Sequence, residues 1–538
     1  MSATSIEPNA VVPVRPQAEP RITLRSFLPA IVVLLASGLM LMLRVQFGGR
    51  FMPDSALMMI ALACYLTAAV FHLMNLYAPS AMALRVGMWT AGLGVFFNLS
   101  SWLVRWVAAY DRELQIFQSQ GRSPSELGWV FRYIPFANLY DLSLAFAFGA
   151  GFTTLLIAHR KNFRFLGAIT LPLAALILVL ARFIGSEIND LQPVLDSYWR
   201  PIHVGIASLS YGVALVCFSI GVVYLIKDGV KIEAMAIWAA LFGLAVIATV
   251  SKGSVFLHLQ YGASTYFPLP DGRKMPLTYL RADIPWVGPA LALAGFMLIG
   301  VIVAFGIYLA KNNETAKLWG HRLLKGSLVV QACAIALLVS QVKTMTDIGS
   351  KLDPRNYEAF GKWLAEQDKM TPEQIAQIPA ADLISHASQF VAANGSKLIL
   401  SLNANPVELA ALITVLTATL FVLIFSFRTE RLRQALPALD KLDSLLYKTG
   451  SVTFAMLAML LITGAIWANE SWGKYWQWDS KETGAFVAWL TYGVFLHTRI
   501  ARGWSGRRSA YFALLGFLFI IFTYLGVSYL LPGLHSYA

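Results

Sequence analysis

Long apolar runs separated by short loops constrain this chain more than any other feature of its sequence. A helix needs about 20 mainly apolar residues to cross the roughly 30 Å of bilayer hydrocarbon, and lipid offers a non-helical backbone no hydrogen-bond partners. Thirteen such runs lie at 27–45, 55–76, 86–104, 138–157, 165–182, 204–226, 233–251, 287–310, 326–345, 404–427, 448–468, 484–500 and 509–531. The sequence therefore predicts an all-α, polytopic integral membrane protein with about 13 transmembrane helices.

The charge pattern gives an expected orientation. Charged residues make up only 13% of the 538 positions and hydrophobic residues 57%, whereas a soluble chain has about 25% charged residues. The net charge of +13 indicates no nucleic-acid partner, because the basic residues gather in short loops. They are Arg160, Lys161, Arg164, Lys227, Lys231, Arg428, Arg431, Arg433, Arg499, Arg502, Arg507 and Arg508. If the helices alternate, these loops share one side, which the positive-inside rule makes cytoplasmic. The N-terminus is then cytoplasmic and the C-terminus outside.

Four regions are expected along the chain. They are a cytoplasmic tail at 1–26, an N-terminal transmembrane region at 27–229 with an outer loop at 105–137, inserted transmembrane helices at 230–430 with outer loops at 252–286 and 346–403, and a tryptophan-rich core at 431–538. The tail lacks the apolar stretch and cleavage site of a signal peptide. The loop at 346–403 is polar and helix-compatible, and Thr371 and Pro372 are expected to begin a helix. We expect a small cap of two or three helices there.

The cysteines argue against two kinds of chemistry. Cys64, Cys217 and Cys333 are isolated and lie inside apolar runs. There is no C-x-x-C redox pair and no C-x-x-C-H site for covalent haem. Thiol chemistry and covalently bound haem are therefore not expected.

The segment 467–482 (WANESWGKYWQWDSKE) contains a cluster of tryptophans. Trp472, Trp476 and Trp478 lie within seven residues, with Gly473 and Asp479 close by. One interpretation is an aromatic belt, since Trp and Tyr gather at both membrane interfaces. A belt gives no reason for the glycine and the aspartate, however. A second interpretation is a platform on which a large flat ligand stacks.

Two histidines flank this segment on the expected outer side. His203 lies where the run 204–226 begins, and His535 follows the run 509–531. Two imidazoles beside an aromatic platform can supply both axial ligands of a haem iron. The alternative is that each is a structural residue at the membrane interface.

Two further histidines lie inside apolar runs. His72 and His497 are both near the expected cytoplasmic ends of their helices. Ionisable groups inside a membrane are costly and are functional candidates by default. A second, membrane-buried bis-histidine haem site is one hypothesis, and hydrogen bonding to a neighbouring helix is the other.

Three stretches resemble one known family. The stretch WGKYWQWDSKET, with the following WLTYGVFLHTR and the terminal LHSY, resembles the tryptophan-rich signature of the system II cytochrome c biogenesis proteins of the CcsA or ResC type. YIPFANLYDLSLAFAFG at 133–149 is similar to the family motif P-x-x-N-x-Y-E, with Asp141 in place of Glu. SYWRPIHVG at 197–205 resembles the region of the family's first external haem histidine. The inserted helices at 230–430 depart from the family pattern.

This resemblance implies a site and its ligand. It implies that haem b is bound non-covalently, with the iron held by His203 and His535 at an external site. His497 would be a ligand at a membrane site, and His72 is assigned to it by depth alone. The other residues implied to bind haem are Trp472, Gly473, Trp476, Trp478 and Asp479. Arg200 or Arg132 is expected to pair with the haem propionates.

The resemblance also implies a function. The chain would deliver haem to apocytochrome c at the outer face of a bacterial inner membrane, as part of a cytochrome c synthase (haem lyase) complex. A membrane partner of the CcsB or ResB type and a thiol-reducing thioredoxin-like protein are implied, and no catalytic residue is assigned. Three other functions stay open: a haem exporter without ligation activity, a respiratory haem b electron-transfer subunit, and a non-catalytic anchor for an assembly complex.

Overall fold

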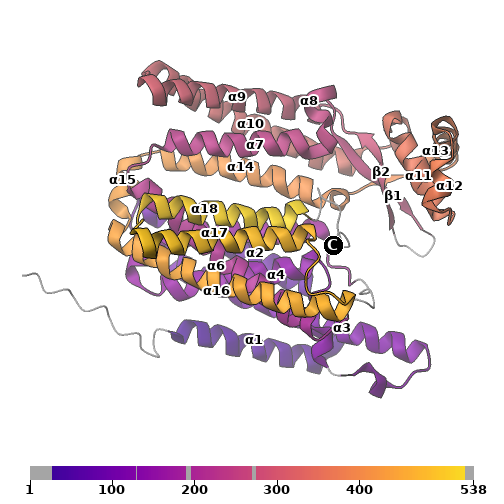
Figure 1. The fold of residues 1–538 in the computed structure, drawn as a ribbon, viewed down its shortest axis with the longest axis horizontal. Helices are drawn as coiled ribbons and strands as arrows, with labels where there is room; N and C mark the ends of the chain where they lie inside the picture. Colours follow the sequence, from indigo (N-terminus) through magenta and orange to yellow (C-terminus); the bar gives the residue numbers. More distant parts are fainter. Residues whose placement is uncertain (1–26, 129, 189–195, 270–273, 528–538) are drawn as a thin grey trace, which may run out of the picture.

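The fold is a bundle of long helices that run side by side (Figure 1). The computed structural model describes residues 27–128, 130–188, 196–269 and 274–527. Within them, 12 helices are long and apolar enough to cross a membrane, which confirms the all-α polytopic class. They are α1 (Leu28–Phe47), α2 (Asp54–Tyr77), α3 (Ala81–Ser119), α4 (Leu139–Ala158), α5 (Gly167–Ile184), α6 (Trp199–Lys227), α7 (Ile232–Thr249), α9 (Val287–Lys311), α10 (Glu314–Thr344), α14 (Pro406–Ser426), α16 (Leu439–Trp472) and α18 (Arg507–Ile521), whose span continues to Gly526.

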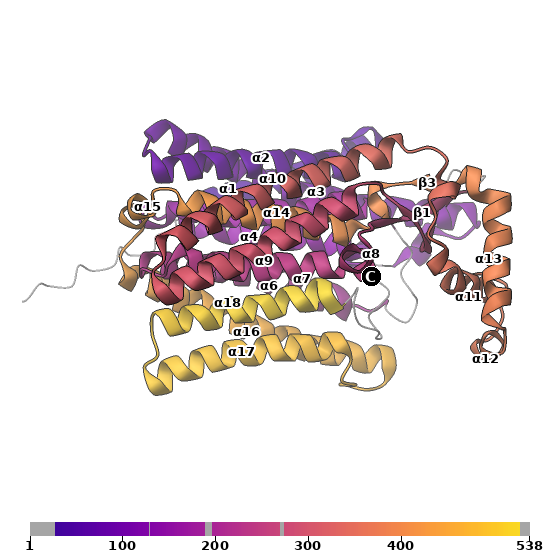
Figure 2. The ribbon, with the colours of Figure 1, turned by 90° about the horizontal axis from the view of Figure 1, so that it is seen from above.

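The expected span at 484–500 is present as helix α17 (Ser480–Arg502) but is not among those 12. Its first turn contains Lys481 and Glu482 and its last turn contains Arg499 and Arg502, so its mean hydropathy is lower. The helix nevertheless lies against α16 and α18 and runs along their length in both views (Figures 1 and 2). Packing against α16 and α18, rather than a high apolar content, therefore aligns α17 with the membrane-spanning helices.

The helices form two groups. Helices α2 to α6 pack with α16, α17 and α18, and α6 contacts α16 and α18 directly although the sequence separates them widely. Helices α7, α9, α10 and α14 form a second layer, seen above the first group in Figure 1. Contact between the groups comes mainly from α14 against α5, with a hydrogen bond of 2.7 Å from the Tyr77 hydroxyl to the Ile424 carbonyl oxygen.

A small cap covers one end of the second layer (Figure 2). Strands β1 (Gly262–Pro268), β2 (Lys274–Asp283) and β3 (Ile399–Leu400) form an antiparallel sheet in the order β2-β1-β3. The expected two or three helices are present as α11 (Tyr357–Gln367), α12 (Pro372–Ala376) and α13 (Ala380–Asn394). Thr371 caps α12 and Pro372 is its first residue, as the sequence predicted. The strands were not predicted. We call this end of the molecule the cap end.

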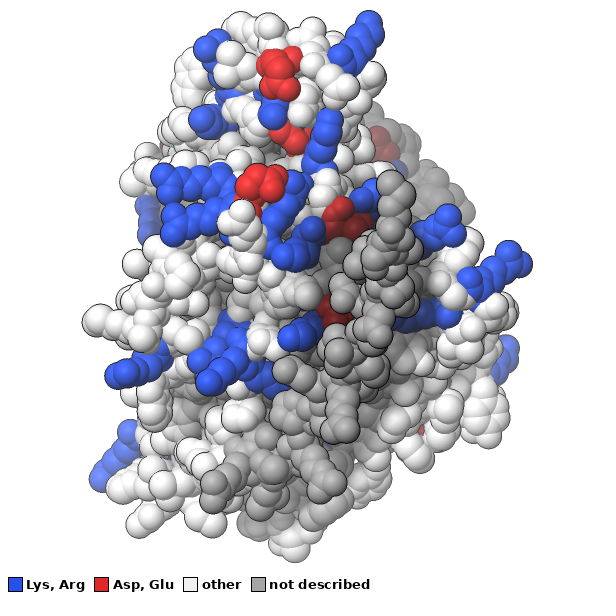
Figure 3. Space-filling model, turned by 90° about the vertical axis from the view of Figure 1, so that its left-hand side faces the viewer, with Lys and Arg blue, Asp and Glu red and all other residues white. Residues whose placement is uncertain are grey.

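The opposite end is rich in basic side chains (Figure 3), and we call it the basic end. Helices α4, α6 and α17 end there, and the short helix α15 (Thr429–Ala435) lies there (Figure 1). The basic loops at 160–164, 227–231, 428–433 and 499–508 therefore share one end of the bundle, as the alternation of helices predicted.

One expected loop is partly helical. The sequence placed an outer loop at 105–137, but α3 continues through it to Ser119. The run 86–104 marked only the apolar part of this helix. The continuation places Arg105 on a helix at the cap end, where its side chain is buried.

Candidate functional site

A cavity of about 170 Å³ lies at the cap end of the first helix group. Residues from α4, α6, α16, α17 and the π-helical turn η12 (Phe522–Gly526) line it. The lining stretches are 136–142, 200–211, 460–485 and 523–524, and most of their side chains in the cavity are aromatic or aliphatic. The cavity therefore combines the motif at 133–149, the region around His203 and the tryptophan-rich segment.

Glycine and acidic residues fix the two ends of the tryptophan-rich loop. Gly473 ends α16 with a φ of 71°, a left-handed conformation that glycine adopts without strain. Asp479 caps α17, and its Oδ1 accepts a hydrogen bond of 2.9 Å from the Lys481 backbone N–H. The Glu482 carboxylate accepts from the backbone N–H groups of Gln477, at 2.8 Å, and Asp479, at 3.2 Å. Gly473 and Asp479 thus shape the loop, and neither lines the cavity.

The tryptophans divide into those in the cavity and one outside it. Trp472 and Trp476 line the cavity, and so does Trp467, to which the sequence gave no separate role. Trp478 is 70% exposed and meets Trp476 edge-on, with 5.7 Å between the ring centroids. The aromatic wall is therefore formed by Trp467 and Trp472 at the end of α16 and by Trp476 in the loop. Trp478 lies outside the cavity and packs against Trp476.

His203 lies in the cavity in an orientation that suits a metal ligand. Its Nδ1 is 3.1 Å from the carbonyl oxygen of Leu460 on α16. The Thr463 hydroxyl oxygen is 3.4 Å from the same nitrogen. Because a carbonyl oxygen only accepts, the contact with Leu460 favours the tautomer that carries its proton on Nδ1, the arrangement typical of histidines that ligate through Nε2. The ring also lies 5.6 Å from that of Trp467, centroid to centroid.

Gly464 makes this position of the His203 ring possible. A Cβ atom at Gly464 would lie 2.8 Å from His203 Cε1 and 3.1 Å from Nδ1. These distances are shorter than the roughly 3.5–4.0 Å optimum for non-bonded carbon atoms. Helix α16 therefore needs a residue without a side chain at this point, one turn after the Leu460 carbonyl that holds the ring.

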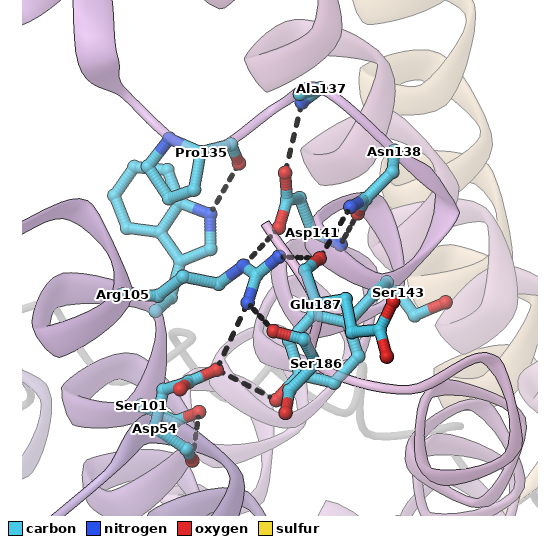
Figure 4. A network of polar contacts seen from close by, with 12 residues as sticks. Asp54, Ser101, Arg105, Pro135, Ala137, Asn138, Asp141, Ser143, Ser186 and Glu187 are labelled. Carbon is cyan, nitrogen blue, oxygen red and sulfur yellow. Dashed lines mark hydrogen bonds and ion pairs between the residues drawn. The ribbon is translucent and has the colours of Figure 1, made fainter. Parts of the chain in front are cut away.

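The far wall of the cavity is held by a buried ionic network centred on Arg105 (Figure 4). Arg105, which is 1% exposed, pairs through Nε with Asp141 on α4 and through Nη1 with Asp54 on α2, at 3.3 Å. It also donates to the carbonyl oxygens of Ser186, at 2.7 Å, and Glu187, at 3.0 Å. One guanidinium thus joins α2, α3, α4 and the segment after α5. A planar group with five donors suits this role.

The same network fixes the segment 135–138 that enters the cavity wall. Asp141 Oδ2 accepts a hydrogen bond of 2.9 Å from the Ala137 N–H, and Asn138 caps α4 by accepting from the Asp141 N–H at 3.0 Å. Trp102 donates to the Pro135 carbonyl at 3.2 Å, and its ring lies 5.2 Å from that of Phe136, centroid to centroid. The residues of the expected P-x-x-N-x-Y-E motif therefore shape the part of the cavity wall formed by 136–142.

Positive charge lines the cavity at its rim. Arg200, in the first turn of α6, is 5% exposed and donates to the Arg132 carbonyl oxygen at 2.8 Å. Lys481, in the first turn of α17, also lines the cavity. Arg132, the expected alternative to Arg200, lies outside it and pairs with Asp196. The hydrogen bonds that the Arg132 guanidinium donates to the Asp196 carboxylate raise the pKa of Arg132 above its usual range.

The structure does not bring His72 and His497 together. His72, on α2, is 2% exposed and is enclosed by Gly87 of α3 and Gly167 of α5; a Cβ at either glycine would lie within 3.1 Å of its ring. His497 is exposed on α17, which lies on the opposite side of the bundle from α2 (Figure 2). One iron cannot bridge residues on these two helices, so the expected membrane site is not formed by this pair. His535 lies outside the described residues.

The residues of the cavity fit a haem group in their chemistry. An imidazole with its lone pair on Nε2, three indole rings and two cationic side chains meet there. The imidazole suits iron, the indole rings suit a flat aromatic ring, and the cationic side chains suit carboxylates. The sequence missed Gly464, Trp467, Lys481 and Arg105. Arg105 gave a signal as an ionisable residue directly after an apolar run, and Trp467 and Lys481 gave one by lying in the tryptophan-rich segment 467–482.

Comparison with known proteins agrees with this chemistry. Residues 136–344 and 406–535 match the family model described as "Cytochrome C assembly protein", and the unmatched stretch between them contains α11 to α13. The "Cytochrome c biogenesis protein CcsA" of Prochlorococcus marinus (strain MIT 9515) is 56% identical over 98 residues, 18% of this chain and 31% of the relative. Its namesake from Synechococcus sp. (strain CC9902) is 54% identical over 98 residues, 18% and 32% of the two chains. The matched stretch thus covers about a third of these curated relatives.

Proposed function

This chain belongs to the cytochrome c assembly protein family, and we propose that it binds haem b non-covalently in the cap-end cavity and presents it to apocytochrome c. Family membership supports a role in cytochrome c maturation. The observation that carries the finer proposal is the His203 ring, whose Nδ1 is held by the Leu460 carbonyl so that Nε2 is the coordinating atom. His203 is one axial ligand in this proposal, and His535, which the structure does not describe, is the other.

The walls of the cavity have separate tasks in this proposal. Trp467, Trp472 and Trp476 offer ring faces and edges to the porphyrin. Gly473 and Asp479 set the ends of the loop that carries Trp476, and Trp478 supports that ring from outside. Two histidine ligands would leave no open position on the iron, which protects it from oxygen outside the cytoplasm.

Entry of the ligand requires the loop to move. The cavity of about 170 Å³ is smaller than the roughly 300–1,000 Å³ of sites for drug-sized ligands. Tyr475 and Trp478 in the loop are 61% and 70% exposed. An outward swing of the loop would mainly break its two hydrogen bonds to Glu482 and the ring contacts with Phe486. We expect the loop to open about Gly473 and close on the bound ring.

The chain is a multi-pass membrane protein, and its orientation is part of the proposal. The basic end would face the cytoplasm of a bacterial inner membrane, which places the cavity on the outer side. Apocytochrome c would dock there with its thiols kept reduced by a thioredoxin-like protein. A membrane partner of the CcsB or ResB type would complete the complex.

Haem is the substrate of the ligation step, and this chain positions it. Each thioether forms when a cysteine S–H adds across a haem vinyl group: the sulfur bonds to one carbon and the proton goes to the other. No oxidant is consumed, so reduced thiols are sufficient. Holding the vinyl groups in place at the cavity would itself accelerate the addition, because it converts a bimolecular encounter into a step within one complex.

An absorption spectrum tests haem binding directly. Purified full-length protein should show the sharp reduced spectrum of a bis-histidine haem, and His203→Ala should weaken it or convert it to a high-spin form. His386→Ala, in cap helix α13 and outside the cavity, is the matched control. An unchanged low-spin spectrum in His203→Ala would rule out His203 as the ligand. Thioether formation with supplied apocytochrome and partner would distinguish assembly from haem export alone.

A further inference from the structure

A second hollow, of about 30 Å³, lies at the cap end of the second helix layer. It shares no lining residue with the cavity that contains His203. Its walls come from the turn after α7, the short helix α8 (Ser254–His258), strand β2 and the cap segment 353–356. Helix α8 lies at the cap end of α9, next to the sheet (Figure 1). The hollow is thus at the level where membrane-spanning helices end, which is the level of lipid headgroups.

Two of the four charged side chains that line this hollow in the described chain have partners of opposite charge. Asp353 pairs with Arg355 at 2.6 Å, and Arg281 pairs with Glu408 at 3.4 Å. Arg281 is 9% exposed, and its Nε is buried without a hydrogen-bond partner. The charge of this guanidinium is therefore balanced, but it still has an N–H group to donate.

The other two charged side chains, Lys252 and Asp283, form no ion pair within the residues that the structure describes. The Lys252 ammonium lies over the Tyr279 ring, 5.1 Å from its centroid. Asp283 Oδ1 is buried and accepts no hydrogen bond. A buried polar atom without a partner costs free energy until a partner is supplied. The hollow thus presents one cation, one anion and one N–H donor, a combination that a zwitterion satisfies.

The backbone at Lys252 has an unusual conformation. Ser251 and Lys252, in the turn η7 (Val250–Gly253), both have a φ of 53°, in the left-handed region that residues other than glycine seldom adopt. Two contacts hold this turn: the Ser251 N–H donates to Glu408 Oε1 at 3.2 Å, and the Ser251 hydroxyl accepts from the Gly262 N–H at 2.8 Å. Strain of this kind persists only where the surroundings fix it, and it is common at ligand sites.

Exposed apolar side chains lie next to the lining residues along the chain. Leu257 and Leu259 are exposed and lie between Ser254 and Gln260, which line the hollow. Trp286 is exposed directly before α9, and tryptophan is enriched where a membrane meets water. A ligand in this hollow would therefore have its charged part among polar side chains and an apolar part beside them, as an amphiphile does.

We propose that this hollow binds the headgroup of a phospholipid that carries a primary amine and no net charge, such as phosphatidylethanolamine. The phosphate accepts from Lys252 and from Arg281 Nε, and the ammonium donates to Asp283. The acyl chains lie against Leu257 and Leu259. This site is separate from haem binding, and a lipid held there would attach the cap to the membrane surface.

The size of the hollow selects the amine. About 30 Å³ has room for about two or three groups the size of a water molecule. An ammonium group fits that space, whereas the trimethylammonium of a choline headgroup is too large. A choline also has no N–H to donate to Asp283 Oδ1, so it would leave this buried atom without a partner.

Native mass spectrometry of the full-length protein in detergent, titrated with lipids that share the same acyl chains, tests this site. Wild-type protein should bind one phosphatidylethanolamine with an apparent Kd about tenfold or more below those for phosphatidylcholine and phosphatidylglycerol, the size expected for a hydrogen bond to a charged group. Equal affinity for the three lipids would overturn the proposal. So would displacement of the lipid by an equal concentration of glycerophosphoethanolamine, because the free headgroup would then be the ligand.

Three variants assign the contacts. Asp283→Asn should remove the preference for the ethanolamine headgroup and leave phosphatidylcholine binding unchanged. Lys252→Met should weaken binding of all three lipids, because they share the phosphate. Lys274→Met, at the other end of β2 and outside the hollow, is the matched control and should bind as the wild type does. A preference that survives in Asp283→Asn, or that Lys274→Met reduces as much, would overturn the proposal.

A structural effect of these substitutions is separated in two ways. Asp283 and Lys252 do not line the cavity that contains His203, so both variants should keep the haem spectrum of the wild type while their lipid binding changes. The comparison of the three lipids on wild-type protein requires no substitution, so it decides the proposal even where a variant fails to fold.

Discussion

Gly464→Ala should disturb the haem ligand without touching it chemically. The new Cβ would lie 2.8 Å from His203 Cε1 and 3.1 Å from Nδ1, so the ring must retreat by roughly 0.5–1 Å to reach ordinary contact distances. That shift strains the 3.1 Å hydrogen bond from Nδ1 to the Leu460 carbonyl, which belongs to the same helix as the intruding methyl group. Overpacking of this kind costs about 1–3 kcal/mol.

Haem titration converts this cost into a measurable loss. At about 1.4 kcal/mol per factor of ten, we expect haem affinity to fall roughly 5- to 150-fold, with a shift of the low-spin bands as the imidazole tilts. Gly205→Ala is the matched control. Gly205 lies on α6, two residues from His203, and its added Cβ would meet Phe136 at 3.6 Å, an ordinary contact. Equal losses in the two variants, or none in Gly464→Ala, would refute the claim that Gly464 makes room for the ligand.

Three further variants test the framework around the site. Arg105→Met leaves two buried carboxylates without their cation, so it should lower the free energy of unfolding by about 3–5 kcal/mol. Arg105→Lys keeps the charge but not the planar guanidinium, so its stability should lie between those of the wild type and Arg105→Met. Equal stability of the wild type and both variants in denaturant unfolding would contradict this. Asp479→Ala removes the cap of α17 and should cost about 0.5–2 kcal/mol, with faster amide exchange in its first turn, whereas Asp479→Asn should retain most of the cap. Burial raises the pKa of Asp283, so the folded chain binds the proton more tightly than the unfolded chain. The ionised carboxylate therefore destabilises the fold most above the raised pKa. This destabilisation is lost as pH falls through the raised pKa towards the ordinary value. Asp283→Asn should therefore stabilise the cap at neutral pH, and the gain should vanish in acid; a gain independent of pH would exclude this cause.

Apolar run length predicted the helices well, because the bilayer leaves the backbone only one solution. It failed where a helix continues beyond the apolar part. Helix α3 extends past the run 86–104 to Ser119, and the strands β1 and β2 occupy what was expected to be a loop at 252–286. Outside the apolar region, tertiary contacts rather than lipid decide the structure, and a single sequence does not reveal them.

The site was predictable only where residue type alone signals chemistry. His203, Trp472 and Trp476 stood out and do line the cavity. The pairing of His72 with His497 failed because equal depth along two helices says nothing about which helices are neighbours, and α2 and α17 lie on opposite sides of the bundle. The sequence gave no signal for Gly464, because this residue acts only by leaving room for the His203 ring. Such a position becomes visible only when the packed ring beside it is seen.

Direct packing of α6 against α16 explains how one cavity forms around so long an intervening stretch. Four long helices lie between them, α7, α9, α10 and α14, and an even number of crossings returns the chain to the basic end from which it left. The second layer rests mainly on α5, and no residue of that layer lines the cavity within the described chain. The His203–Leu460 bond therefore lies within the α6–α16 interface. It follows that changes in the second layer should alter what docks at the cap end while leaving the ligand geometry intact, whereas a change of one methyl group at the α6–α16 interface should alter the ligand itself.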